Sequence, residues 1–251
     1  MATHPQKVYY VGMDRRHYYV KLASRYLELA PSGIDNMTEL LHQYAVLGST
    51  YSEPRRWYHN LDHIFTGHIM HVVTYGDMPA PEFFAWMYHD VVYEPAAPDN
   101  EVRSADMFLR DNAKIGFGVR EADKVVDLIL STRHIGEKNV ITDIDLVGLG
   151  FKPEVYDEYN ALIRLEYSGF SADEWRTGRT AFLTHMLTSG PIFVTPEFFQ
   201  YEAPAKENLR RELTNLVGEE IVLRVLKADM AEGKYENWQQ KPKPPLGSLK
   251  T

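Results

Sequence analysis

The sequence predicts an all-α fold, and three observations lead to that prediction. Apolar residues recur at helical spacing in most segments between the prolines and glycines. The sequence contains no series of alternating strands separated by hairpin turns. Consecutive apolar residues from Phe83 to Met87 predict a helix that is buried nearly all round.

The expected helices follow one another along the chain. The first spans residues 35–47, and a second runs from about residue 60 to 75, where Gly76 stops it. Pro81 stands in the first turn of the buried helix, a position that favours proline. Further helices are expected at 100–110, 121–131, 152–167, 177–188 and 205–230.

The chain of 251 residues suits one large domain that can bury a substantial core. We expect an N-terminal extension at 1–35 and a helical domain at 36–235. The stretch 236–251 is rich in proline and lysine and is predicted to be a flexible tail.

Composition excludes several classes of partner and chemistry. The net charge of −8 argues against binding to long nucleic acids or anionic lipids. The absence of cysteine excludes disulfides, thiolate catalysis and Cys-ligated zinc. No stretch approaches the roughly twenty apolar residues of a membrane span, and the N-terminus lacks a secretory core. The expected location is cytoplasmic.

The adjacent pair His89-Asp90 ends the buried helix and is the strongest chemical signal. Burying both groups is costly unless something pairs with them, and a cation satisfies both at once. The alternative is a self-contained pair in which the carboxylate orients the imidazole. Imidazole and carboxylate ligands suit a divalent Mn, Co, Mg, Fe, Ni or Zn ion.

Partners for this pair lie on both sides of it in the sequence. His59 and His63 are four residues apart and share one helical face, and His63 is the preferred ligand. Asp143 and Asp145 diverge on a helix, so only one should reach the metal. Asp145 is the first choice, because aspartate at Asp143 is also explained by helix capping.

Several fragments occur in an order that resembles a known family. They read PRRWYHNLDHI at 54–64, YHDVVY at 88–93 and DNEVRSA at 99–105, with further matches at 131–134, 143–146, 163–167, 178–179 and 208–209. Together they resemble the predicted metal-dependent phosphohydrolases of the HD superfamily. The resemblance runs from about residue 36 to 213.

The resemblance implies an HD-type helical bundle with additional C-terminal helices, and a metal held by His63, His89, Asp90 and Asp145, with His59 as a substitute for His63. Members of the superfamily hydrolyse phosphomonoesters, cyclic nucleotides or nucleoside triphosphates. Others carry a second metal on extra histidines and oxidise their substrates. His134 is the only histidine between His89 and Asp145, so phosphate hydrolysis is preferred here.

Residues within or beside these fragments are candidates for the chemistry. Glu101 or His134 is expected to act as general acid or base, or to support a metal ligand. Arginines bind phosphate oxygens, and a solvated helix face is the alternative for each of them. The candidates are Arg55 or Arg56, Arg103, Arg164 and above all Arg133 and Arg179.

Aromatic residues bear on the substrate. Tyr156, Tyr159 and Tyr167 follow one expected helix and could stack on a base, although core packing is the usual role of such residues. The expected function is hydrolysis of a phosphate ester in a small phosphorylated molecule, in particular a nucleotide. The alternatives are a di-iron oxygenase on the same scaffold and a non-catalytic nucleotide-binding protein. Assembly into a homo-oligomer stays open.

Overall fold

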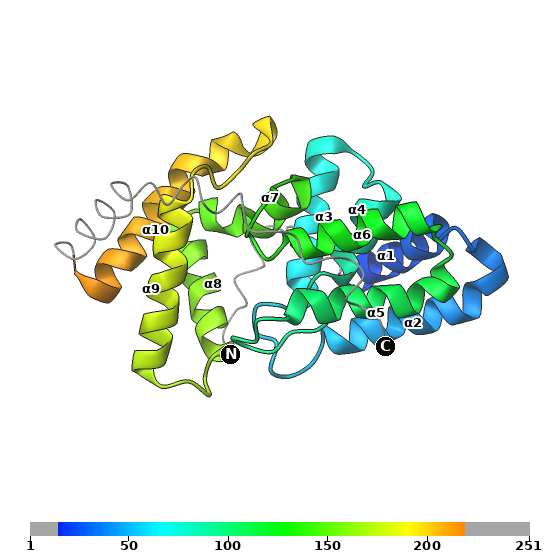
Figure 1. The fold of residues 1–251 in the computed structure, drawn as a ribbon, viewed down its shortest axis with the longest axis horizontal. Coiled ribbons are helices and arrows are strands. Elements are labelled where there is room, and N and C mark those ends of the chain that lie inside the picture. The colour runs from blue at the N-terminus through cyan, green and yellow to red at the C-terminus, as the bar shows by residue number, and fades with distance from the viewer. Residues whose placement is uncertain (1–14, 219–251) are drawn as a thin grey trace.

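The computed structural model describes residues 15–218, and every regular element in that part of the chain is helical (Figure 1). The all-α prediction is confirmed. The elements are α1 (Arg15–Leu29), η2 (Gly33–Asn36), α2 (Met37–Thr50), α3 (Leu61–Tyr75), α4 (Ala80–Tyr88), α5 (Asn100–Ile115), α6 (Val119–Ser131), α7 (Val140–Leu146), η3 (Val147–Gly150), α8 (Pro153–Glu166), α9 (Ala172–Thr188), η4 (Pro196–Tyr201) and α10 (Glu202–Val217).

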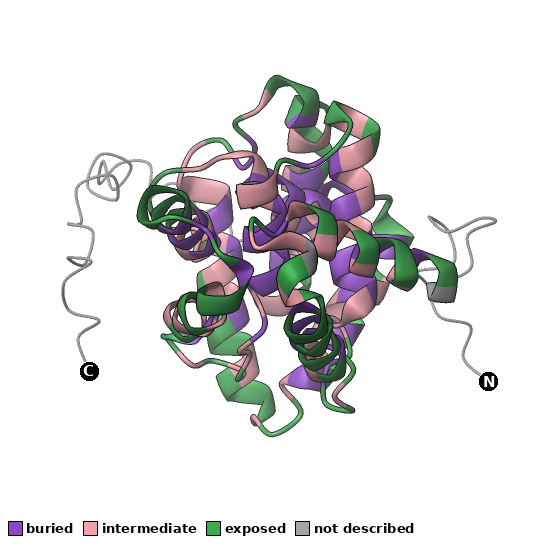
Figure 2. Ribbon diagram, turned by 90° about the vertical axis from the view of Figure 1, so that its right-hand side faces the viewer, coloured by how far each residue is buried: buried purple, intermediate pink, exposed green. Residues whose placement is uncertain are grey.

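Helix α4 lies at the centre of the hydrophobic core. Its residues 83–88 are all buried, and α3, α5 and α6 pack around it. Figure 2 shows buried residues gathered in the interior of the molecule. The predicted burial of this helix is therefore confirmed, and His89 at its C-terminal end has no exposed surface.

Most helices begin or end within a few residues of the predicted positions. Asn60 caps α3, and its side chain accepts hydrogen bonds from the backbone N–H groups of Asp62 and His63. Helix α9 begins earlier than expected because Ser171 and Glu174 form a capping box. A serine followed three residues later by glutamate is visible in the sequence, so this earlier start could have been predicted.

Two helices were missed by the sequence analysis. Helix α1 lies within the predicted N-terminal extension, where Leu22 and Tyr26 are buried in the core. Helix α7 is a short helix begun by Asn139. The helix expected at 205–230 is observed as α10 up to Val217, and its remainder and the tail at 236–251 lie outside the described residues.

Helices α8, α9 and α10 are grouped at one end of the molecule, and α1 to α6 at the other (Figure 1). The side-chain amide of Asn208 on α10 donates to the carbonyl groups of Leu149 and Phe151, which ties α10 to the chain around η3. Within residues 15–218, no helix has the combined length and apolar character that crossing a membrane requires.

Candidate metal centre

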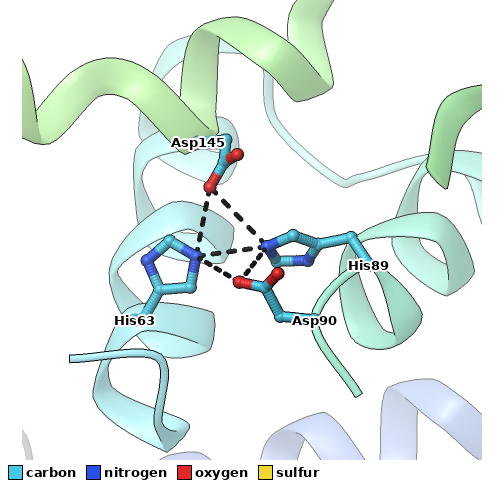
Figure 3. A group of neighbouring side chains, drawn as sticks. All are labelled: His63, His89, Asp90 and Asp145. Atoms are coloured by element: carbon cyan, nitrogen blue, oxygen red, sulfur yellow. Dashed lines mark hydrogen bonds and ion pairs between the residues drawn. The ribbon is translucent and has the colours of Figure 1, made fainter. Parts of the chain in front are cut away.

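Three helices bring together four side chains that could hold a metal ion (Figure 3). His63 lies in the first turn of α3, His89 and Asp90 lie at the C-terminal end of α4, and Asp145 lies in α7. One donor atom from each residue lies within 4.8 Å of the other three. We call these four residues the His/Asp cluster.

Local sequence determines where each of these residues lies. The Asn60 cap begins α3 and so places His63 in its first turn. Asn139 and Thr142 form a capping box that begins α7 and positions Asp145 one turn later. The apolar faces of these helices are buried in the core, so the polar ends converge on the same point.

Several donor atoms of the cluster lie within hydrogen-bond distance of one another. The Nε2 atom of His63 is 3.2 Å from Nε2 of His89 and 3.2 Å from Oδ1 of Asp145. The Nε2 atom of His89 is 3.1 Å from Oδ2 of Asp90. Two imidazole nitrogens and two carboxylate oxygens therefore surround one common position.

The orientation of His89 is held by its other ring nitrogen. Its Nδ1–H donates to the backbone carbonyl of Trp86 at 2.8 Å, and its ring stacks on the Trp86 indole with centroids 4.4 Å apart. A carbonyl oxygen can only accept, so the proton of the neutral imidazole is on Nδ1. The lone pair of Nε2 then faces the cluster, as metal coordination requires.

The charged groups of the cluster act strongly on one another. Burial alone lowers the pKa of His89, but the carboxylates of Asp90 and Asp145 outweigh it and raise this pKa well above its usual value. Burial favours protonation of the two aspartates, yet neighbouring histidines hold the pKa of each below the usual range. The donor set of two imidazoles and two carboxylates fits a divalent Mn, Co, Mg, Fe, Ni or Zn ion.

His134 contacts the cluster from outside. Its Nε2 atom is 2.8 Å from Oδ2 of Asp145, the carboxylate oxygen that faces away from His63 and His89. The residue has a φ of 53°, in the left-handed region that histidine, asparagine and aspartate enter more often than other residues except glycine. Its Nδ1 atom is buried without a hydrogen-bond partner. His134 is thus placed to orient Asp145.

His59 does not belong to the cluster. Its Nδ1 atom is 2.6 Å from Oε2 of Glu166, and its ring stacks on Tyr93 with centroids 4.1 Å apart. The other oxygen of Glu166 accepts from the backbone N–H groups of Tyr58 and His59. His63 and not His59 belongs to the group whose donor atoms lie within 4.8 Å of one another.

Asp143 has a different role from Asp145. Its buried carboxylate accepts hydrogen bonds from the backbone N–H groups of Val194 and Thr195 and from the Thr195 hydroxyl. The helix cap expected at Asp143 is supplied by Asn139 instead. Asp143 therefore anchors the segment before η4.

A pocket of about 820 Å³ opens beside the cluster. It lies between the metal-binding helices and the group formed by α8 and α9. Asp90 and Asp145 line it, together with the sequence candidates Glu101, His134 and Arg179. Arg133 is not among its lining residues, although its charge acts on Glu101.

The candidate arginines are held by the protein itself. Arg179 is buried and makes two hydrogen bonds, of 2.8 and 3.0 Å, to the carboxylate of Glu212. Arg56 donates to the carbonyl groups of Asp90 and Val91, and Arg164 donates to that of Tyr167. Arg55 forms ion pairs with Glu53 and Glu94, and Arg103 is exposed.

Two glutamates that matter to the site were missed by the sequence analysis. Glu166 fixes His59, and Glu212 neutralises Arg179. Glu166 lay within a fragment of the family resemblance, but nothing local linked it to a histidine 107 residues away. Nothing in the sequence around Glu212 marked it as a partner of Arg179.

The comparisons with known proteins add no relative from which a role could be carried over. No family model matches the sequence. Searches of curated proteins and of solved structures also find no match.

Proposed function

We propose that this chain is a metal-dependent phosphohydrolase of the HD type that acts on a small phosphorylated molecule, in particular a nucleotide. One observation carries the proposal: the His/Asp cluster contributes Asp90 and Asp145 to the wall of a pocket of about 820 Å³. A pocket of this size accommodates a small organic ligand. Substrate and metal would therefore meet at these two carboxylates.

His63, His89, Asp90 and Asp145 would hold the metal. A divalent cation at this position lowers the pKa of a coordinated water molecule and polarises a phosphoryl oxygen. The two carboxylates balance the charge of the cation, and the Trp86 carbonyl keeps the His89 ring oriented toward it. His134 holds the outer oxygen of Asp145 and so limits rotation of that carboxylate.

Glu101 is the proposed general acid. It lines the pocket, and burial together with the charge of Asp90 raises its pKa, against opposing effects of its own backbone, Arg133 and His134. A carboxyl group with a raised pKa retains its proton closer to neutral pH. It can then protonate the leaving oxygen as the phosphate ester bond breaks.

Reconstitution of the metal-free protein tests the proposal. After chelation, the protein is loaded separately with Mn, Co, Mg, Fe, Ni or Zn and offered phosphomonoesters, cyclic nucleotides and nucleoside triphosphates. We expect phosphate release from at least one class with at least one metal. Glu101→Gln should lower kcat while metal content stays unchanged. If the fully metallated protein cleaves none of these compounds, the hydrolase proposal is wrong, and a binding protein or an oxygenase remains.

The second candidate is a di-iron oxygenase on the same scaffold. It is favoured by the position of Asp145, whose second oxygen faces another histidine, His134, as a bridging carboxylate would. Against it, only one group of three or more metal-binding side chains is found within residues 15–218. Metal analysis separates the two: one ion per chain supports the hydrolase, whereas two irons with oxygen consumption support the oxygenase.

A further inference from the structure

We propose that the pocket selects phosphate monoesters whose organic group is a flat aromatic ring, and that it discriminates against di- and triphosphates. This inference rests on the proposed hydrolase function and narrows its substrate class. It follows from two independent properties of the pocket wall, its aromatic surface and its lack of an unpaired cation.

The aromatic surface is formed where α8 ends and α9 begins. Tyr167, Phe170 and Trp175 form a contiguous group, with the Tyr167 ring centroid 5.4 Å from that of Phe170 and 5.3 Å from that of Trp175. All three line the pocket and are only partly buried. Aromatic residues of the core, such as Phe83 and Trp86, are fully buried.

A partly buried aromatic group facing a pocket offers a stacking platform. Any base or similar ring can stack on such a surface, because every such ring has a π-face. Two arginines already contact Trp175: the guanidinium carbons of Arg164 and Arg179 lie 5.3 and 5.8 Å from its ring centroid. The platform is therefore held in place before a ligand arrives.

The charge of the pocket wall disfavours polyphosphates. Arg179 is the one lysine or arginine among the described residues that line it, and Glu212 already pairs with its guanidinium. The lining carboxylates outside the His/Asp cluster are Glu101, Asp173 and Glu174. Of these, Glu174 caps α9 and Asp173 is exposed at the N-terminal end of the same helix.

The metal can bind one phosphoryl group directly, but not every phosphate of a chain. A phosphate monoester carries a charge of about −1.5 to −2 near neutral pH, all of it on the group that would coordinate the cation. Sites that bind triphosphates surround the additional phosphates with lysine, arginine or backbone N–H groups. Among the described residues that line this pocket, only Arg179 could play that part, and Glu212 already pairs with its guanidinium. The volume admits either ligand, so charge is what separates them.

The first test compares substrates on the metal-loaded protein. We expect kcat/KM for a nucleoside 5′-monophosphate to exceed that for the matching triphosphate by about 100-fold. It should also exceed that for glycerol 3-phosphate, a monoester without a ring, by about tenfold. Binding of the mono- and triphosphate is measured in parallel by calorimetry, so that selectivity is observed even without turnover.

Two variants test the two properties of the wall separately. Trp175→Leu should raise KM for the nucleoside monophosphate by about 5- to 140-fold, the range expected for loss of one stacking partner, and leave glycerol 3-phosphate unaffected. Phe199→Leu is the matched control, because Phe199 is exposed and outside the pocket lining. Asp173→Lys should raise kcat/KM for the triphosphate several-fold relative to the monophosphate.

The outcomes distinguish this inference from the proposed function. Equal hydrolysis of mono- and triphosphates, or of ringed and ringless esters, overturns the inference and leaves the hydrolase intact. Selective binding of the monophosphate without turnover overturns the hydrolase and leaves the selectivity intact. Neither binding nor hydrolysis of any of these compounds overturns both.

Discussion

Buried charged groups are arranged differently in the His/Asp cluster and in the helices around it, which we call the shell. In the shell, two charged side chains are each matched by a partner: Arg179 pairs with Glu212, and His59 with Glu166. In the cluster, two carboxylates share one small volume, and two imidazole nitrogens lie 3.2 Å apart. The shell groups therefore satisfy one another, whereas the four cluster donors converge on one position that a cation could occupy.

This difference separates ion pairs that stabilise the fold from groups arranged for a ligand. Removing a partner in the shell leaves a buried charge unpaired and should destabilise folding. Removing a group from the cluster takes away a proposed metal ligand and should abolish metal binding with a smaller effect on the fold. Variants of the two regions therefore test the comparison directly.

The largest effect is expected from loss of a cluster residue. His89→Ala and Asp90→Ala should each lose bound metal and phosphohydrolase activity, with affinity falling by more than the roughly 10- to 100-fold typical of supporting residues. The helical circular dichroism signal should persist. Metal content of the purified variants provides the measurement.

His71→Ala is the matched control for these variants. His71 is a second buried histidine of α3, but its Nε2 atom pairs with Glu82 at 3.1 Å and lies outside the cluster. It should retain a full complement of metal. Full metal occupancy in both cluster variants would contradict the assignment of the centre.

Arg179→Ala should produce the opposite pattern, with metal retained and stability lost. Both partners of the Arg179–Glu212 pair are mostly buried, so the unpaired carboxylate should cost about 3–5 kcal/mol in the free energy of unfolding. Urea denaturation measures this. The double variant Arg179→Met, Glu212→Leu should recover most of the loss. An unchanged midpoint for Arg179→Ala would show that the pair is not structural.

His68 provides a pH-dependent test within the shell. Its Nδ1 atom lies 2.6 Å from the Tyr18 hydroxyl, and burial, with smaller effects of His71 and Arg25, lowers its pKa from 6.5 to about 4. Between these two pH values the unfolded chain binds the proton more readily than the folded one. His68 therefore does not destabilise the folded state above pH 6.5, and the free energy of unfolding falls as the pH drops from 6.5 toward 4.

The free energy of unfolding is expected to fall by about 3 kcal/mol over that pH interval, because each pKa unit corresponds to roughly 1.36 kcal/mol. Urea denaturation of the metal-free protein at several pH values measures it. His68→Gln cannot titrate, so its stability should fall less on acidification. If the stability of the wild type and of this variant falls equally with pH, His68 is not a cause of the acid sensitivity.

The smallest effects are expected from neutralising either aspartate of α7, and the two variants should differ in what they change. Asp143→Asn should cost about 1–3 kcal/mol of stability, because the new amide donors would face the N–H groups of Val194 and Thr195. It should retain the metal. Asp145→Asn should weaken metal binding with little effect on stability. Side-by-side metal titrations check this, and the reverse order would move the ligand to Asp143.

Much of the fold was predictable because helical patterns are local. The apolar run before His89 predicted a buried helix, and Asn60 and Gly76 marked the ends of α3. The same local reasoning pointed to a cation at His89-Asp90. Helix α1 was missed because it lies in a segment taken as an extension, and its buried face becomes evident only where α2 packs against it.

The choice among candidate residues depended on contacts between distant parts of the chain. His59 and His63 share a face of the predicted helix, but only the packing of α8 places Glu166 against His59 and leaves His63 in the cluster. Arg179 resembled a phosphate ligand until α10 brought Glu212 to it. Periodicity reports on neighbours within a few residues, whereas these pairings arise from helix packing. The sequence thus determined the helices and the metal-binding residue types, and the tertiary structure decided which charges were already paired.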